Sequence, residues 1–154
     1  MLNGKKIVVT GCASGIGKEV ARLIKEAGGY VLGVDLSVTD DYVDELYRAD
    51  LSDPDSIRDL IHVLPRGIDG LANVAGLPPT KPAAKVLAVN YVGLKALTVG
   101  LVPKMADGAS VVNVASLAGI GWPNMVSSIL ESESLAFEDI EQFVKTHDAG
   151  DAGG

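Results

Sequence analysis

The chain is poor in cysteine, in aromatic residues and in long uncharged apolar runs. Its single cysteine, Cys12, excludes an internal disulfide framework and fits a reducing compartment. No uncharged apolar run approaches the length of a membrane span, and no opening stretch resembles a secretory signal. We therefore expect a cytoplasmic protein that has no membrane partner.

Basic residues and metal-ligating residues are also scarce. The 13 lysines and arginines stand against 20 acids, giving a net charge of −7, and no basic patch is interleaved with aromatics. Nucleic-acid binding is therefore not expected, because phosphate backbones are bound by concentrated positive charge. One cysteine and two distant histidines, His62 and His147, predict no metal site. The acidic excess lies in residues 131–154, which hold seven acids and one base, and predicts a solvated helical face or a lid.

The chain does contain a regular alternation of short apolar runs and helical patterns. At 154 residues and 47% hydrophobic content, it is long enough for one domain with a substantial core. Most runs are apolar on both faces, which is typical of a parallel sheet covered by helices on each side. We predict an α/β fold, a doubly wound parallel sheet with its ligand crevice at the carboxyl ends of the strands. The predicted strands are residues 7–10, 30–35, 46–49, 68–74 and 109–115, and the helices begin at residues 16, 54 and 86.

A glycine-rich turn joins the first predicted strand to the first helix. Its sequence is Thr10-Gly11-Cys12-Ala13-Ser14-Gly15-Ile16-Gly17. Glycines admit positive φ and close approach of the backbone, and the helix N-terminus that follows presents N–H groups and partial positive charge. A strand before the turn and a helix after it are the context that a dinucleotide-binding turn requires. The turn therefore predicts a phosphate-binding site; Cys12 within it is expected to be a small packing residue.

A carboxylate ends the second predicted strand. Asp35 follows Gly17 by 18 residues, which is the place of an acid that accepts both hydroxyls of a ribose. The same carboxylate would repel a 2′-phosphate. Positions 13 and 14 are Ala13 and Ser14, so they lack the lysine or arginine that would attract that phosphate. We therefore predict NAD rather than NADP as the cofactor.

These marks resemble the short-chain dehydrogenase/reductase family, whose cofactor turn matches Thr10 to Gly17. Further matches follow in order: Asp50-Leu51, Asn73-Val74-Ala75-Gly76 with valine in place of a second asparagine, Asn90 in the long helix, and Ser116 after the fifth strand. The resemblance implies a Rossmann fold and hydride transfer between nicotinamide and a small-molecule carbonyl or secondary alcohol. The predicted catalytic residues are Ser116 and Asn90. The predicted cofactor-binding residues are Gly11, Ser14, Gly15, Ile16, Gly17, Asp35, Asp50, Leu51, Asn73, Ala75 and Gly76.

The chain departs from the family pattern after the serine. The family's Tyr-x-x-x-Lys pair is absent, since no tyrosine follows Tyr91. The sequence resembles a subgroup similar to 3α-hydroxysteroid dehydrogenase/carbonyl reductase, in which an inserted helical segment separates serine from tyrosine. On this interpretation residues 1–122 are the NAD-binding core, and residues 123–154 are an acidic helical insertion with a flexible glycine-rich end in the same domain. The fold is then incomplete, the tyrosine lies past Gly154, and the chain as given is expected to be inactive.

Two other functions remain open from the sequence. The chain can be a non-catalytic dinucleotide-binding or regulatory module that has no tyrosine at all. A methyltransferase also uses a glycine turn and an acid after the second strand. For the oligomer, the long helix and the segment after Pro123 resemble the family's dimer-forming helices, so a homodimer or homotetramer is expected.

Overall fold

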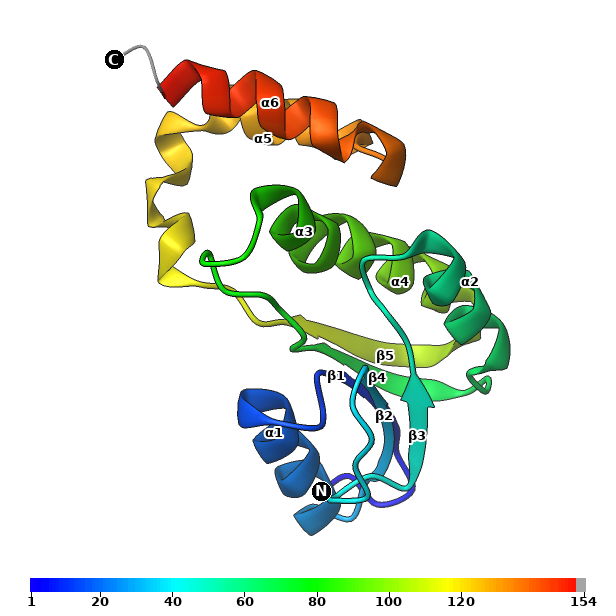
Figure 1. The fold of residues 1–154 in the computed structure, drawn as a ribbon. Helices are drawn as coiled ribbons and strands as arrows, with labels where there is room; N and C mark the ends of the chain where they lie inside the picture. The colour runs from blue at the N-terminus through cyan, green and yellow to red at the C-terminus, as the bar shows by residue number, and fades with distance from the viewer. Residues whose placement is uncertain (152–154) are drawn as a thin grey trace.

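The computed structural model describes residues 1–151 as a five-stranded parallel sheet with helices on both faces (Figure 1). The order across the sheet is β3-β2-β1-β4-β5. This confirms the predicted doubly wound α/β fold, in which the order reverses between β1 and β4 and opens a crevice at their carboxyl ends. The strands are β1 (Lys6–Thr10), β2 (Tyr30–Asp35), β3 (Glu45–Arg48), β4 (Ile68–Asn73) and β5 (Met105–Asn113).

The core has two layers, one on each side of the sheet. Helix α1 (Gly15–Glu26) covers one face, and helices α2 (Pro54–Val63) and α4 (Leu94–Leu101) cover the other (Figure 1). Val8 and Val9 are consecutive in β1 and both fully buried, but they belong to apolar clusters on opposite faces. Burial on both faces explains why this strand is a continuous β-branched run rather than an alternating one.

The start of α2 follows from two residues that the sequence places there. The side chain of Asp53 accepts a hydrogen bond from the backbone N–H of Asp55 at 3.0 Å, and Pro54 occupies the first helical position. Proline has no N–H to leave unpaired there, and its fixed φ suits the first turn. The predicted start of this helix at residue 54 is confirmed, and the β3–α2 connection before it borders the cavity.

The long helix after β4 is continuous but not uniform. It begins at Ala83, three residues before the predicted start, and consists of α3 (Ala83–Leu87), the π-helical turn η1 (Ala88–Gly93), α4 and the 3₁₀ turn η2 (Val102–Lys104). By length and composition alone, residues 83–104 are apolar enough to cross a membrane. In this fold Leu97 and Leu101 are fully buried in the cluster that packs on the sheet, so the apolar side is a core face.

Strand β5 begins four residues earlier than predicted. Ile68 pairs with Met105, but Gly70 pairs with Ser110, so an irregularity lies between these two pairs. The bulged segment contains Asp107 and Gly108, whose φ is +77°. Asp-Gly is a turn signal in the sequence, whereas here the strand passes through it as a bulge.

The final described segment packs across the outside of the long helix (Figure 1). Ile140 is buried with Ala88 and Val92, and Phe143 and Val144 are half-buried. The segment after Ser116 consists of 3₁₀ turns and two α-helices. The elements are η3 (Leu117–Asn124), α5 (Val126–Glu131), η4 (Ser132–Ser134), η5 (Phe137–Asp139) and α6 (Ile140–Asp151). The predicted flexible end lies mostly outside the described residues.

Candidate functional site

The glycine turn is held in shape by positive φ and by close contact. Gly11 has φ +71°, and a Cβ built on it would lie 2.9 Å from the Cα of Ala75. A Cβ on Gly17 would lie 2.0 Å from the carbonyl oxygen of Gly11. Gly15 has φ +51°, but a Cβ on it would meet nothing within 4 Å. The turn is therefore tightly packed at its two ends, by Gly11 against the loop after β4 and by Gly17 against the first carbonyl of the turn itself, while Gly15 faces open space.

Helix α1 begins at this turn with an uncompensated N-terminus. Ser14 is its N-cap residue, yet no side chain within residues 1–151 caps the first turn, and that turn contains no acid. The helix has 12 residues, so its N–H groups and dipole place partial positive charge at Gly15, Ile16 and Gly17. This is the geometry that receives a phosphate or pyrophosphate group.

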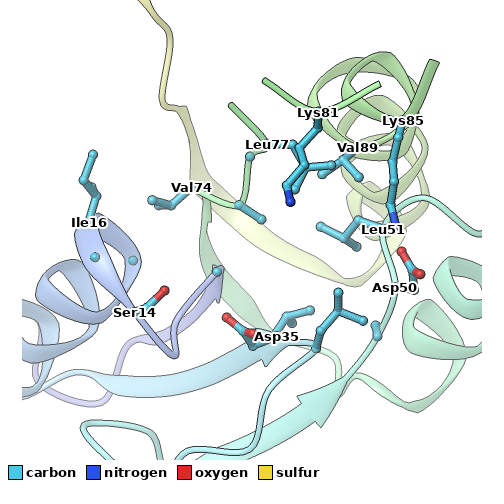
Figure 2. A pocket seen from close by; sticks show the side chains of 18 residues that line it. Ser14, Ile16, Asp35, Asp50, Leu51, Val74, Leu77, Lys81, Lys85 and Val89 are labelled. Carbon is cyan, nitrogen blue, oxygen red and sulfur yellow. The ribbon is translucent and has the colours of Figure 1, made fainter. Parts of the chain in front are cut away.

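A cavity of about 540 Å³ lies at the carboxyl ends of the strands, beside this turn (Figure 2). It brings together most of the predicted cofactor residues, although they come from four separate connections of the chain. The predicted residues that line it are Gly11, Ser14, Gly15, Ile16, Gly17, Asp35, Asp50, Leu51, Ala75 and Gly76; the others are Val34, Leu36, Ala49, Val74, Leu77, Lys81, Lys85 and Val89.

Asp35 connects the end of β2 to the glycine turn. Its Oδ2 accepts a hydrogen bond from the backbone N–H of Ala13 at 3.0 Å, and its Oδ1 accepts one from Ser37 at 2.9 Å. These bonds fix the carboxylate at the cavity wall (Figure 2). Each carboxylate oxygen has a second lone pair, so both can accept a further hydrogen bond from a ligand hydroxyl.

Asp50 and Leu51 form the wall that follows β3. Oδ1 of Asp50 accepts hydrogen bonds from the hydroxyl of Ser52 at 2.6 Å and from its backbone N–H at 2.8 Å. These two bonds lower the pKa of Asp50, and the positive charge of Lys85 lowers it further. The carboxylate is therefore ionised at neutral pH and acts only as an acceptor. Leu51 beside it is 8% exposed and provides an apolar surface.

Thr10 holds the loop that follows β4, a role not predicted from the sequence. It is 1% exposed, and its hydroxyl accepts hydrogen bonds from the N–H groups of Val74 and Ala75, both at 3.0 Å. Asn73 is 3% exposed and is not among the described residues that line the cavity. Its amide donates to Thr98 and Asn113 instead, so it joins β4 to α4 and β5.

The two predicted catalytic residues are not among the described residues that line this cavity. Asn90 lies in the π-helical turn, and its side chain is hydrogen-bonded to the loop after β4. Its amide oxygen accepts a hydrogen bond from the N–H of Leu77 at 2.7 Å, and its amide nitrogen donates one to the carbonyl of Leu77 at 2.9 Å. It lines a second cavity of about 340 Å³, between the long helix and α6. Ser116 is exposed, follows β5 and accepts a backbone bond from Gly119. Among the described residues, Ser116 lines neither cavity.

Two lysines that were not predicted from the sequence line the main cavity. Lys81 and Lys85 project from the start of the long helix region toward its interior, across from Asp35 (Figure 2). Nothing in their sequence context distinguishes them from surface lysines.

Cys12 is fully buried behind the turn, and burial, with the charge of Asp35, raises the pKa of its thiol to about 11. The thiol is therefore neutral and unreactive, in keeping with a packing role.

The arrangement is suited to binding an extended anion with hydroxyl groups. It offers helix N–H donors for a phosphate, a fixed carboxylate for hydroxyls, and apolar surfaces at Leu51 and Val89 for a flat ring. Among the side chains that the structure describes, no group of three or more His, Cys, Asp or Glu residues is placed to hold a metal ion. The residues present therefore fit a dinucleotide.

Comparison with known proteins agrees with this geometry. The family model for short chain dehydrogenases matches residues 5–127. The chain is 47% identical over 122 residues to coniferyl-alcohol dehydrogenase from Pseudomonas sp. (strain HR199 / DSM 7063), covering 79% of this chain and 48% of that protein. It is 35% identical over 107 residues to 3-alpha-hydroxysteroid dehydrogenase/carbonyl reductase from Comamonas testosteroni, covering 66% and 39%. The chain thus spans about half the length, or less, of these relatives.

Solved structures of similar fold carry either nicotinamide cofactor. The 3-alpha-hydroxysteroid dehydrogenase from Pseudomonas sp. B-0831, complexed with NADH, matches with a TM-score of 0.73 and 28% identity over 93% of this chain and 57% of its own. The Pseudomonas aeruginosa RhlG/NADP complex matches with a TM-score of 0.69 and 30% identity over 77% of this chain and 56% of its own.

Proposed function

The chain belongs to the short-chain dehydrogenase/reductase family, and we propose that it is the cofactor-binding part of an NAD-dependent oxidoreductase. The bound nicotinamide supplies the hydride donor or acceptor for a carbonyl or alcohol substrate. The single observation that carries the proposal is the convergence of the uncapped α1 N-terminus and the fixed Asp35 carboxylate on one cavity.

Each half of this convergence has a separate task. The N–H groups of Gly15, Ile16 and Gly17 receive the pyrophosphate, which the helix dipole favours. Asp35 accepts the hydroxyls of the adenosine ribose. The bonds from Ala13 and Ser37 hold its carboxylate in place, so little ordering is required when the cofactor enters.

Asp35 also supports the choice of NAD over NADP. A 2′-phosphate at this position would bring about two negative charges against the carboxylate. Ala13 and Ser14 provide no cation to offset them. The two lysines of the cavity, Lys81 and Lys85, lie on the opposite wall (Figure 2).

Turnover is proposed to require groups that these 154 residues do not include. Ser116 is assigned to hydrogen-bond the substrate oxygen, and Asn90 to support the proton path through its place in the helix. A tyrosine general acid or base, with its pKa lowered by a neighbouring lysine, has no counterpart after Tyr91. We therefore expect these 154 residues to bind cofactor, weakly, and to catalyse no reaction.

The substrate is proposed to be a small alcohol or carbonyl compound. Coniferyl alcohol is the first substrate to test on a longer polypeptide, since a relative named for it is 47% identical. A cytoplasmic location and assembly as a homodimer or homotetramer remain proposals. The side of the long helix that carries Ala88 and Val92 packs against Ile140 of α6.

The test of the proposed function is a binding titration of the unmodified chain by calorimetry. NADH, NADPH and S-adenosylmethionine are compared under the same conditions. Binding of NADH more tightly than either competitor supports the proposal. Tighter S-adenosylmethionine binding would instead favour a methyltransferase, and tighter NADPH binding would overturn the cofactor assignment. NADH binding with no turnover by any longer form of the polypeptide would favour the non-catalytic module.

A further inference from the structure

Lys85 and Asp50 lie beside one another on the cavity wall farthest from the glycine turn. Lys85 extends from α3, and its ammonium points toward the Asp50 carboxylate (Figure 2). Leu51 adjoins Asp50, and Val89 follows Lys85 by about one helical turn, so an apolar surface lies next to the pair. A donor and an acceptor at the edge of an apolar surface are the features that bind a heteroaromatic ring.

The two groups differ in how firmly they are held. Asp50 is anchored through one oxygen by the two bonds from Ser52, while its other oxygen receives no hydrogen bond in residues 1–151. Lys85 makes no ion pair and no side-chain hydrogen bond within that same part of the chain, although its charge acts on Asp50. A fixed acceptor therefore lies next to an ammonium group that has three donors.

We propose that Lys85 is a specificity residue that hydrogen-bonds the adenine ring together with Asp50. This inference rests on the proposed function. Adenine carries an amino donor at C6, with an acceptor ring nitrogen on either side of it. Asp50 accepts from the amino group, and Lys85 donates to the adjacent ring nitrogen. Leu51 and Val89 contact the ring itself.

Lys81 provides the matched control. It also lines the cavity and carries the same charge, but it lies in the loop before α3 and borders the second cavity as well. If the cavity lysines acted only by attracting an anion, loss of Lys81 and loss of Lys85 would have the same effect on ligand binding. Lys81 and Lys85 therefore separate long-range attraction from contact with the base.

The experiment compares NADH with reduced nicotinamide mononucleotide, using nicotinamide fluorescence to measure both dissociation constants. Each ligand carries about two negative charges near neutral pH, but only NADH contains adenine. Lys85→Met is expected to weaken NADH binding about three- to tenfold, the effect of one lost hydrogen bond, and to leave the mononucleotide unchanged. Lys85→Arg is expected to restore most of the NADH affinity. Lys81→Met is expected to change binding of both ligands by the same factor.

The outcomes distinguish this inference from the proposed function. If the unmodified chain binds no NADH, the proposed function fails. If it binds NADH but Lys85→Met changes both ligands equally, or neither, the assignment of Lys85 to adenine is overturned while the cofactor site stands. Because Lys85 is exposed, the substitution should leave the unfolding midpoint in urea unchanged, which checks that the variant is folded.

Discussion

Replacing Asp35 with alanine should change the affinities for NADH and NADPH in opposite directions. In the proposed complex its carboxylate accepts the two ribose hydroxyls, and a hydrogen bond to a charged group contributes about 1.5–3 kcal/mol. Because the site is open to solvent, we take about 2–3 kcal/mol for the pair, which corresponds to about 30- to 150-fold weaker NADH binding. NADPH binding should become about fivefold tighter, because repulsion of roughly 1 kcal/mol between the carboxylate and the 2′-phosphate is removed.

The substitution also has a structural cost that must be separated from its effect on binding. The N–H groups of Ala13 and Ser37 lose their acceptor, and water can replace it because both are at least partly exposed. We expect about 1 kcal/mol of lost stability in urea unfolding. Calorimetric titration of each variant with NADH and NADPH measures the binding terms.

Asp44→Ala is the control for the Asp35 prediction. Asp44 likewise accepts a backbone hydrogen bond, from Val31 at 2.7 Å, and it pairs with Lys25 at 2.6 Å, but it does not line the cavity. This variant should lose stability and keep the ratio of NADH to NADPH affinity. The reasoning is refuted if Asp35→Ala weakens both ligands equally, or if both variants change the ratio alike.

Three further substitutions test the supports of the site. Gly17→Ala should destabilise the chain by about 3 kcal/mol or prevent folding, because the new methyl group would overlap the carbonyl of Gly11. Gly15→Ala would meet no atom and should cost only about 1 kcal/mol of backbone strain. Equal urea midpoints for the two variants would count against this packing. Thr10→Val should cost about 2–4 kcal/mol, because two backbone N–H groups lose their acceptor, and Thr10→Ser should recover most of it; a neutral valine would show that the hydroxyl is dispensable. Ser52→Ala should raise the pKa of Asp50 toward its ordinary value of 3.8, measured by NMR titration of the carboxyl carbon. A lowered pKa in the folded chain stabilises it above the unfolded pKa, so this contribution is lost as pH falls below about 3.8, and Ser52→Ala should flatten the stability profile there. An unchanged profile would contradict the assigned cause.

Most residues of the main cavity could be identified from the sequence because their signals are local. A glycine turn between a strand and a helix, and acids where strands end, require only the order of elements along the chain. The parallel sheet then brings Gly15, Asp35 and Asp50 to one edge, where the structure places them around a single cavity. The start of α2 was equally local, since Asp53 and Pro54 are a cap and a first-turn residue.

The features that were missed depend on contacts distant in sequence. The motif predicts that Asn73 contacts the cofactor, but its amide donates hydrogen bonds to Thr98 of α4 and Asn113 of β5. Thr10 supports a loop 64 residues away, which no spacing within the turn reveals. The same applies to Lys85, which becomes a candidate only because its helix lies next to Asp50.

The most direct test of the central claim is to locate NADH on the unmodified chain by NMR. The backbone amide signals of residues 13–17 should shift on titration, together with those of residues 35–37 and 50–51, because these segments line one cavity. The largest shifts are expected at Gly15, Ile16 and Gly17, whose N–H groups begin α1. Shifts confined to other parts of the chain, or no shifts at saturating NADH, would contradict the assignment of this cavity as the cofactor site.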